Sequence, residues 1–100
     1  MSEKYNGWTN YETWCVALWM DNEERTRRYW CDEAREALKN FEGPADAADR
    51  LADAIADDHQ EGQAGIVGKP SVFSDLLNAA LSEVNWHEIA RHYIETVKEV

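Results

Sequence analysis

The sequence has little cysteine, proline or glycine, and it has no long apolar run. Its 100 residues include two cysteines, two prolines and five glycines, and the longest unbroken apolar segment is Trp14–Met20. Seven residues cannot cross a bilayer, which needs ~20. So few glycines and prolines, without low-complexity runs, argue against disorder. We therefore predict one folded domain, residues 1–100, with cytoplasmic localisation in the absence of a visible signal or anchor motif.

Cys15 and Cys31 belong to no paired motif, which excludes a disulfide framework of the kind found in small secreted domains. A disulfide between them would require the helices that carry them to pack together. Reduced, buried thiols are the interpretation that we prefer.

Basic residues are also scarce, ten against twenty acidic ones, so the formal net charge is −10. Such a balance argues against direct binding of nucleic acid or of an anionic membrane. It favours solubility and basic protein partners.

Aromatic side chains are abundant, and three of the five tryptophans lie in the segment WTNYETWCVALWM, residues 8–20. Thr9 and Glu12 have the spacing of a capping box at a helix start. The helix that follows, from about Asn10 to Met20, is apolar nearly all round, which is typical of a buried helix. The sequence therefore predicts that this is the central helix of the domain.

Helical periodicity continues along the chain, and no segment shows the alternation of a strand. We expect a second helix to about Phe41, a third from Pro44 to about His59, a fourth opened by Ser71 or Ser74, and a last one capped by Asn85 with Glu88. A polar lead-in, residues 1–8, and a glycine-rich loop, residues 61–70, complete the chain. The prediction is an all-α, compact bundle of four to five short helices. Its expected core is Trp14, Leu18, Trp30, Leu38, Leu51, Ile55, Leu77, Trp86, Ile89 and Tyr93, and on the fourth helix Phe73, Leu76, Ala80 and Val84 also face inward.

No motif indicates catalysis, a cofactor or a metal. The glycine-rich loop departs from a phosphate-binding loop at Gln63 and Pro70, and a helix rather than a strand precedes it. His87 and His92 are five residues apart, which places them on different faces of a helix, unlike a zinc-binding pair. We therefore expect a protein that is not an enzyme and that needs no cofactor.

One basic cluster, Arg25, Arg27 and Arg28, lies early in the second helix. Pairing with nearby carboxylates such as Glu24 and Asp32 explains it more simply than docking of an acidic partner.

The third helix carries the most informative charge pattern. Asp46, Asp49, Asp53 and Asp57 recur at spacings of three, four and four, opposite an apolar stripe of Leu51 and Ile55. Such a row of carboxylates is typical either of a solvated surface or of a surface that takes the place of nucleic acid. The predicted partner-binding face is Asp46, Asp49, Asp53, Asp57, Asp58 and Glu61.

An alternative interface is aromatic and consists of Tyr5, Trp8 and Tyr29. It would suit a structural or regulatory interaction module, with a homodimer among its forms. The sequence leaves open which surface is used, what the target is and which oligomer forms.

The opening YNGWTNYETW, residues 5–14, resembles that of a family of short, largely uncharacterised proteins of phages, plasmids and some archaeal and bacterial genomes. The similarity continues at VALW, residues 16–19, and at LLNAALSEVNWHEIARHYIE, residues 76–95. The resemblance implies a mobile-element setting in a prokaryotic cell and supplies no catalytic residues. By analogy with small acidic proteins of such elements, we expect an anti-CRISPR or anti-restriction inhibitor that binds the basic, nucleic-acid-handling surface of a defence complex.

Overall fold

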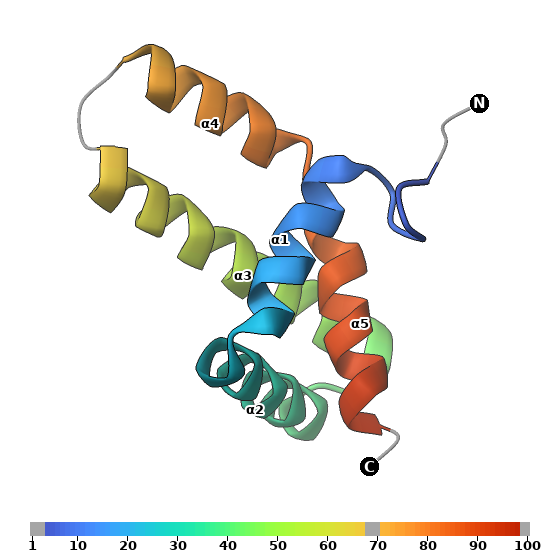
Figure 1. The fold of residues 1–100 in the computed structure, drawn as a ribbon. Helices are drawn as coiled ribbons and strands as arrows, with labels where there is room; N and C mark the ends of the chain where they lie inside the picture. The colour runs from blue at the N-terminus through green and yellow to red at the C-terminus, as the bar shows by residue number, and fades with distance from the viewer. Residues whose placement is uncertain (1–3, 68–70, 99–100) are drawn as a thin grey trace.

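The computed structural model describes residues 4–67 and 71–98, and this part of the chain forms five helices (Figure 1). In chain order they are α1 (Tyr11–Asn22), α2 (Glu24–Asn40), α3 (Pro44–Val67), α4 (Val72–Ser82) and α5 (Trp86–Lys98). The described residues contain no strand, and their only extended pairing is one bridge between Tyr5 and Trp8. The all-α prediction is confirmed.

Helices α2, α3 and α5 form the centre of the molecule. The most extensive contact is between α3 and α5, and both also pack on α2. Four alanines at these contacts are fully buried, which lets the helix axes approach closely: Ala34, Ala47, Ala48 and Ala90. Larger side chains fill the space between them, among them Trp30, Leu51, Ile55, Ile89 and Tyr93, all at most 3% exposed and all predicted as core.

Helix α1 is not the centre of the fold, so the prediction made for it is wrong. It packs on α2 and α5 from one side, and its buried residues are Thr13, Ala17 and Met20. Trp14 is only half-buried, Leu18 is 37% exposed and Trp19 is 71% exposed. A helix that lies on the outside of a layer can bury one face only, whatever the rest of its surface contains.

Helix α4 also departs from the expectation. It packs mainly on α3 and runs back beside the C-terminal half of that helix (Figure 1). Phe73 and Leu76 were expected to face inward, but they are 72% and 65% exposed. Leu77 and Ala80 are half-buried, and Val84, just after the helix, is buried. Because α4 has a neighbour on one side only, half of its apolar surface stays in solvent.

The two remaining core predictions are met in part: Leu38 and Trp86 are half-buried and pack against the core. Phe41 packs against it in the same way.

The expected glycine-rich loop, residues 61–70, is largely helical. Helix α3 continues to Val67, and residues 68–70 lie outside the described part of the chain. Glu61, Gln63 and Ala64 are of types that favour helix, and each residue added to a formed helix brings one backbone hydrogen bond. A glycine in a helix costs ~1 kcal/mol relative to alanine, and Gly62 and Gly65 lie within α3 without ending it.

The lead-in folds back through the tight turn that Asn6-Gly7 predicts. Both residues have positive φ, 49° and 89°, and the backbones of Tyr5 and Trp8 exchange hydrogen bonds of 2.7 and 2.8 Å. Tyr5 then packs against Tyr11 and Trp14, with ring centroids 5.2 and 5.0 Å away. The turn is thus part of the folded structure from Tyr5 onward.

The predicted capping boxes are partly replaced by long-range bonds. Asn10, not Thr9, caps α1, by accepting hydrogen bonds from the backbone N–H and the hydroxyl of Thr13. The Asn85 side chain accepts from the Glu88 N–H as expected. However, the Glu88 carboxylate accepts from the Thr9 N–H instead of closing its own box. A network of bonds between the start of α1 and the start of α5 results.

Candidate functional site

The acidic face of α3, which we define as Asp46, Asp49, Asp53 and Asp57, is exposed along its whole length. At ~100° per residue these four positions fall within an arc of about 80°. Leu51 and Ile55 point away from it into the core, as predicted. The face therefore presents a row of carboxylates to solvent without disturbing the packing behind it.

Within the described residues, one member of the acidic face has an ion-pair partner. The Asp49 carboxylate lies 2.9 Å from His87 Nε2 of α5. No basic side chain of the described part lies within ion-pair distance of Asp46, Asp53 or Asp57. The field of these carboxylates is thus directed mainly at solvent and at whatever binds there.

The structure separates the other two predicted acidic residues. Glu61 is exposed and lies one helical turn beyond Asp57, so it extends the acidic face. Asp58 instead borders a hollow of about 280 Å³ beside α2, together with Arg25, Tyr29 and Trp30. The six predicted residues therefore do not form one continuous surface.

The three predicted aromatic residues do not form one surface either. Trp8 is half-buried, with its ring edge-on to His92 at 5.3 Å, and Tyr5 lies beside it across the turn. Tyr29 is 54% exposed on α2 and packs against Trp30. The nearby Glu33, then burial and Asp58, raise the pKa of Tyr29. Tyr5 and Trp8 hold the lead-in in place, while Tyr29 belongs to the hollow beside Asp58.

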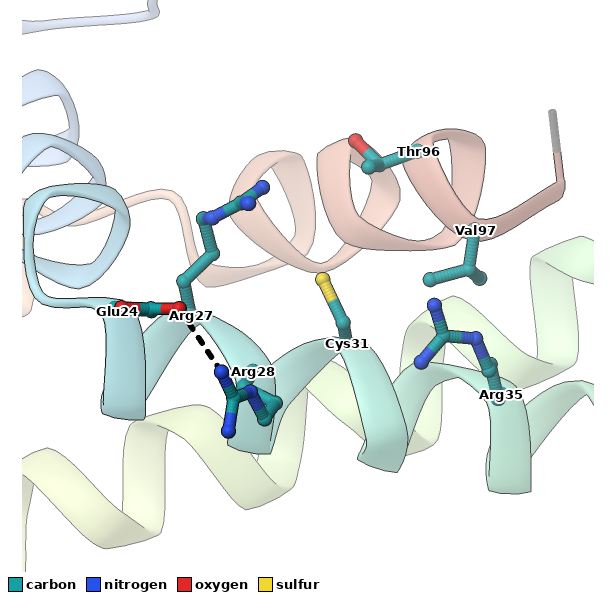
Figure 2. Close-up of a pocket in the computed structure, with 7 residues that line it drawn as sticks. All are labelled: Glu24, Arg27, Arg28, Cys31, Arg35, Thr96 and Val97. Carbon is teal, nitrogen blue, oxygen red and sulfur yellow. Dashed lines mark hydrogen bonds and ion pairs between the residues drawn. The ribbon is translucent and has the colours of Figure 1, made fainter. Parts of the chain in front are cut away.

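Arg27, Arg28 and Arg35 of α2 line a groove against α5, of about 320 Å³ (Figure 2). We call it the arginine groove, and its lining residues are Glu24, Arg27, Arg28, Cys31, Arg35, Thr96 and Val97. In Figure 2 the Cys31 sulfur points toward α5, between the side chains of Arg27 and Arg35. Cys31 is buried and both cysteines are free thiols.

Two of these arginines form ion pairs with acidic side chains nearby. Arg28 pairs with Glu24 and Arg35 with Asp32, each at 2.9 Å. The expected pairing of the basic cluster is thus met for Arg28 with Glu24, whereas Asp32 pairs with Arg35, outside the cluster. Arg25 lies apart, in the hollow beside Tyr29. Cys31 and Arg35 were not connected with the cluster from sequence, although their spacing from Arg27, four and eight residues, places them on one helix face. The groove is of mixed charge and offers no concentrated positive surface.

A partly buried polar contact joins α1 to α5. The Tyr93 hydroxyl donates a 2.7 Å hydrogen bond to Asp21 Oδ1, and His92 Nε2 lies 3.4 Å from Asp21 Oδ2. Burial alone would raise the pKa of Asp21, but the hydrogen bonds from His92 and Tyr93 outweigh it and lower the pKa. Burial and the Asp21 carboxylate raise the pKa of Tyr93. This contact has a structural role as a clamp between the two helices.

The histidines are dispersed. His87 and His92 each contact one carboxylate, and His59 Nδ1 lies 2.8 Å from the Ile55 carbonyl oxygen. In residues 4–67 and 71–98 no three His, Cys, Asp or Glu side chains are placed to hold a metal ion. Nor is any helix in this part of the chain long and apolar enough to span a membrane.

An apolar surface that sequence reasoning missed lies on α4. Val72, Phe73 and Leu76 are 63%, 72% and 65% exposed. The sequence pattern predicts that Phe73 and Leu76 face inward. The same periodicity arises whether a neighbouring helix or a separate molecule covers the stripe, so the pattern alone could not distinguish the two.

A comparison with protein-family models gives one match, over residues 1–99, to a model described as a family of unknown function (DUF7249). Neither a curated protein nor a solved structure matches the chain.

Proposed function

The chain belongs to a family of unknown function, DUF7249, and from that premise we propose that it acts by binding, with the acidic face of α3 docking on a basic protein surface. The proposed partner is the nucleic-acid-handling surface of a larger complex. By occupying that surface, the protein competes with DNA or RNA and inhibits the complex. It performs no chemistry itself.

The observation that supports this proposal most is the exposed row of carboxylates on α3. Each of the four is exposed, and the net charge of −10 adds a negative field that steers a basic surface toward the protein. If the face is only solvated and binds no partner, the loss of these charges should leave inhibition unchanged. The two interpretations therefore differ in a measurable way.

The charge spacing fits one strand of nucleic acid better than a duplex. Asp46 and Asp57 are eleven residues apart, or ~16 Å along the helix axis. Over that length a duplex carries ~10 phosphates, but each strand carries only ~5. Four carboxylates, with Glu61 one turn further on, approach the charge density of a single strand. The proposed docking site on the partner is therefore a groove that follows one backbone.

We place this activity in a mobile genetic element of a prokaryotic host, as an inhibitor of CRISPR or restriction complexes in the cytoplasm. The setting rests on the opening YNGWTNYETW and its resemblance to proteins of such elements. The inhibitory step rests on the acidic surface.

The test is DNA cleavage by a panel of purified CRISPR effector complexes and restriction endonucleases, with and without the protein. The variant replaces Asp46, Asp49, Asp53 and Asp57 by Asn, which changes the net charge from −10 to −6. At ~1 kcal/mol per lost contact, affinity for a sensitive complex should fall about a thousandfold.

The control has the same net charge but keeps the acidic face, with Gln at Glu36, Glu42, Glu83 and Glu95, all exposed. It should inhibit nearly as well as the wild type. If a sensitive complex is found and the folded Asn variant inhibits it fully, the acidic face is not the binding site.

A second candidate is an interaction module in which the protein pairs with itself. The exposed apolar side of α4 favours it, because acidic mimicry gives that surface no role.

A further inference from the structure

The exposed apolar side of α4 is a continuous surface on one helix. Val72, Phe73 and Leu76, with Ala79, are exposed side chains of α4, and we define them as the α4 apolar face. We propose that this face is the interface of a homodimer, in which α4 of a second copy packs on it about a two-fold axis. This inference goes beyond the acidic face, and neither depends on the other.

The charge of α4 favours a second copy over a basic partner. The chain is 30% charged, yet Asp75 is the single charged residue between Val72 and Ser82. A partner recruited by negative charge would find little of it here. In a two-fold dimer the same face meets itself, so an apolar surface is its own complement.

The position of Asp75 is compatible with such pairing. At ~100° per residue it lies about a quarter turn from the centre of the α4 apolar face. The two Asp75 side chains of a dimer therefore stay at the rim, in water, and need no partner. Val72 and Leu76 occupy the centre of the face, where burial contributes most, and Phe73 and Ala79 flank them.

The helix is also placed where another molecule can reach it. It lies at the edge of the molecule, beside the C-terminal half of α3 (Figure 1). The radius of gyration, 14.1 Å, exceeds the ~13 Å typical of a chain of 100 residues. The α3–α4 pair thus projects from the core and leaves the α4 apolar face free of steric obstruction.

The area available sets the strength of the dimer. From the exposed fractions of Val72, Phe73 and Leu76, each copy presents on the order of 350 Å² of apolar side-chain surface. Two such faces with their polar rims give a total of roughly 1,000 Å², at the lower limit for a specific interface. We therefore expect a dissociation constant in the micromolar range, ~1–100 μM.

Because the net charge is high, the salt dependence of association distinguishes the homodimer from docking of the acidic face on a basic partner. Two copies of charge −10 repel each other, and salt screens that repulsion. The homodimer should therefore tighten as ionic strength rises, whereas docking of the acidic face on a basic partner should weaken. Opposite responses to salt separate the two associations in the same preparation.

The experiment is sedimentation velocity of the full chain between 1 and 200 μM, in 50 and 500 mM NaCl. The wild type should shift from monomer to dimer with concentration, at lower concentration in high salt. The double variant Phe73→Glu, Leu76→Glu should remain monomeric at 200 μM. The matched control, Asn78→Glu with Ser82→Glu, adds the same charge to exposed positions of α4 outside the apolar face and should still dimerise.

Three results would overturn the proposal: a wild type that is monomeric at 200 μM in both salts, a dimer that weakens with salt, or a dimer that the double variant retains. Circular dichroism checks that the variants fold. If the Glu variant unfolds, Phe73→Ser with Leu76→Ser takes its place without added charge. The nuclease assay on the monomeric variant then tests the acidic face independently.

Discussion

Helices α1 and α5 are of similar length, and the more apolar of the two is the less buried. Helix α1, YETWCVALWMDN, buries only Thr13, Ala17 and Met20. Helix α5, WHEIARHYIETVK, has more polar residues, yet it buries Ile89, Ala90, Tyr93, Ile94 and Val97. In α5 the apolar residues recur at helical spacing, and the other positions are mostly polar. Periodicity, not total hydrophobicity, therefore determines which helix lies in the core of this protein.

The comparison also explains why the core contains so few large rings. The centre is made by alanines and branched aliphatic residues of α2, α3 and α5, and Trp30 and Tyr93 are the only buried aromatic residues in the described part of the chain. Tyr5, Tyr11 and Trp14 pack on one another at its edge. We can test this division by substitutions in the two helices, taken here from the largest expected effect to the smallest.

Ile94→Ala in α5 should have the largest effect. The side chain is fully buried, so its removal should lower the free energy of unfolding by ~2–5 kcal/mol. Urea unfolding followed by circular dichroism gives this value. A loss below ~1 kcal/mol would show that α5 is not the centre of the core.

Thr13→Val should have the next largest effect, because it breaks the link between α1 and α5. The Thr13 hydroxyl donates to Asn10 Oδ1 at 2.6 Å and accepts from the Asn85 N–H at 2.8 Å. Valine keeps the shape but leaves that N–H without its partner, at a cost of ~1–3 kcal/mol. Thr13→Ser retains the hydroxyl and serves as the control in the same unfolding assay. Equal stability of Val and Ser variants would contradict the role given to this bond.

Tyr93→Phe should have a smaller effect that depends on pH. It removes the hydrogen bond to Asp21, whose partly exposed carboxylate reduces the expected loss to ~1–2 kcal/mol at pH 7. Because the pKa of Asp21 is lowered in the folded protein, its stabilisation is present above the unfolded value, ~4, and is lost as the pH falls through the folded value.

The difference between wild type and Tyr93→Phe should therefore shrink when urea unfolding is repeated near pH 3. A difference that stays constant between pH 7 and pH 3 would mean that the hydroxyl does not stabilise the ionised form of Asp21.

Trp19→Ala in α1 should have the smallest effect, despite the size of the side chain. At 71% exposure the indole has little packing to lose, so we expect a change within ~0.5 kcal/mol. Thermal unfolding measures it against Trp30→Ala, which should cost ~3–5 kcal/mol because Trp30 is 3% exposed. Comparable losses of stability for Trp19→Ala and Trp30→Ala would show that the edge of the fold contributes as much stability as its core.

Much of the fold follows from local patterns. The stripe of Ile89, Tyr93 and Val97 predicts the buried side of α5, and Leu51 with Ile55 predicts that of α3. The turn at Asn6-Gly7 is read from two residues that tolerate positive φ. In each case the signal is complete within about two helical turns or one tight turn of sequence.

The features of the fold that the sequence does not predict depend on which helices lie next to one another in space. Nothing local in Trp14–Met20 shows that α1 has neighbours on one side only. The same applies to Phe73 and Leu76, since a stripe of this kind looks alike whether its cover is another helix or a second molecule. For the candidate site, the row Asp46 to Asp57 was predictable from spacing, but the turning of Asp58 toward α2 was not.

The bonds between the start of α1 and the start of α5 have a consequence for the order of events during synthesis. Asn10 Nδ2 donates to the Glu83 carbonyl, and the Thr13 hydroxyl accepts from Asn85, contacts that span 73 and 72 residues. Helix α1 leaves the ribosome first, yet these two bonds can form only after the residues just before α5 have been made. At ~5–20 residues per second, this interval lasts about 4–15 s. During it the start of α1 is held only by contacts with the part of the chain that already exists, such as the packing of Trp14 on Tyr5.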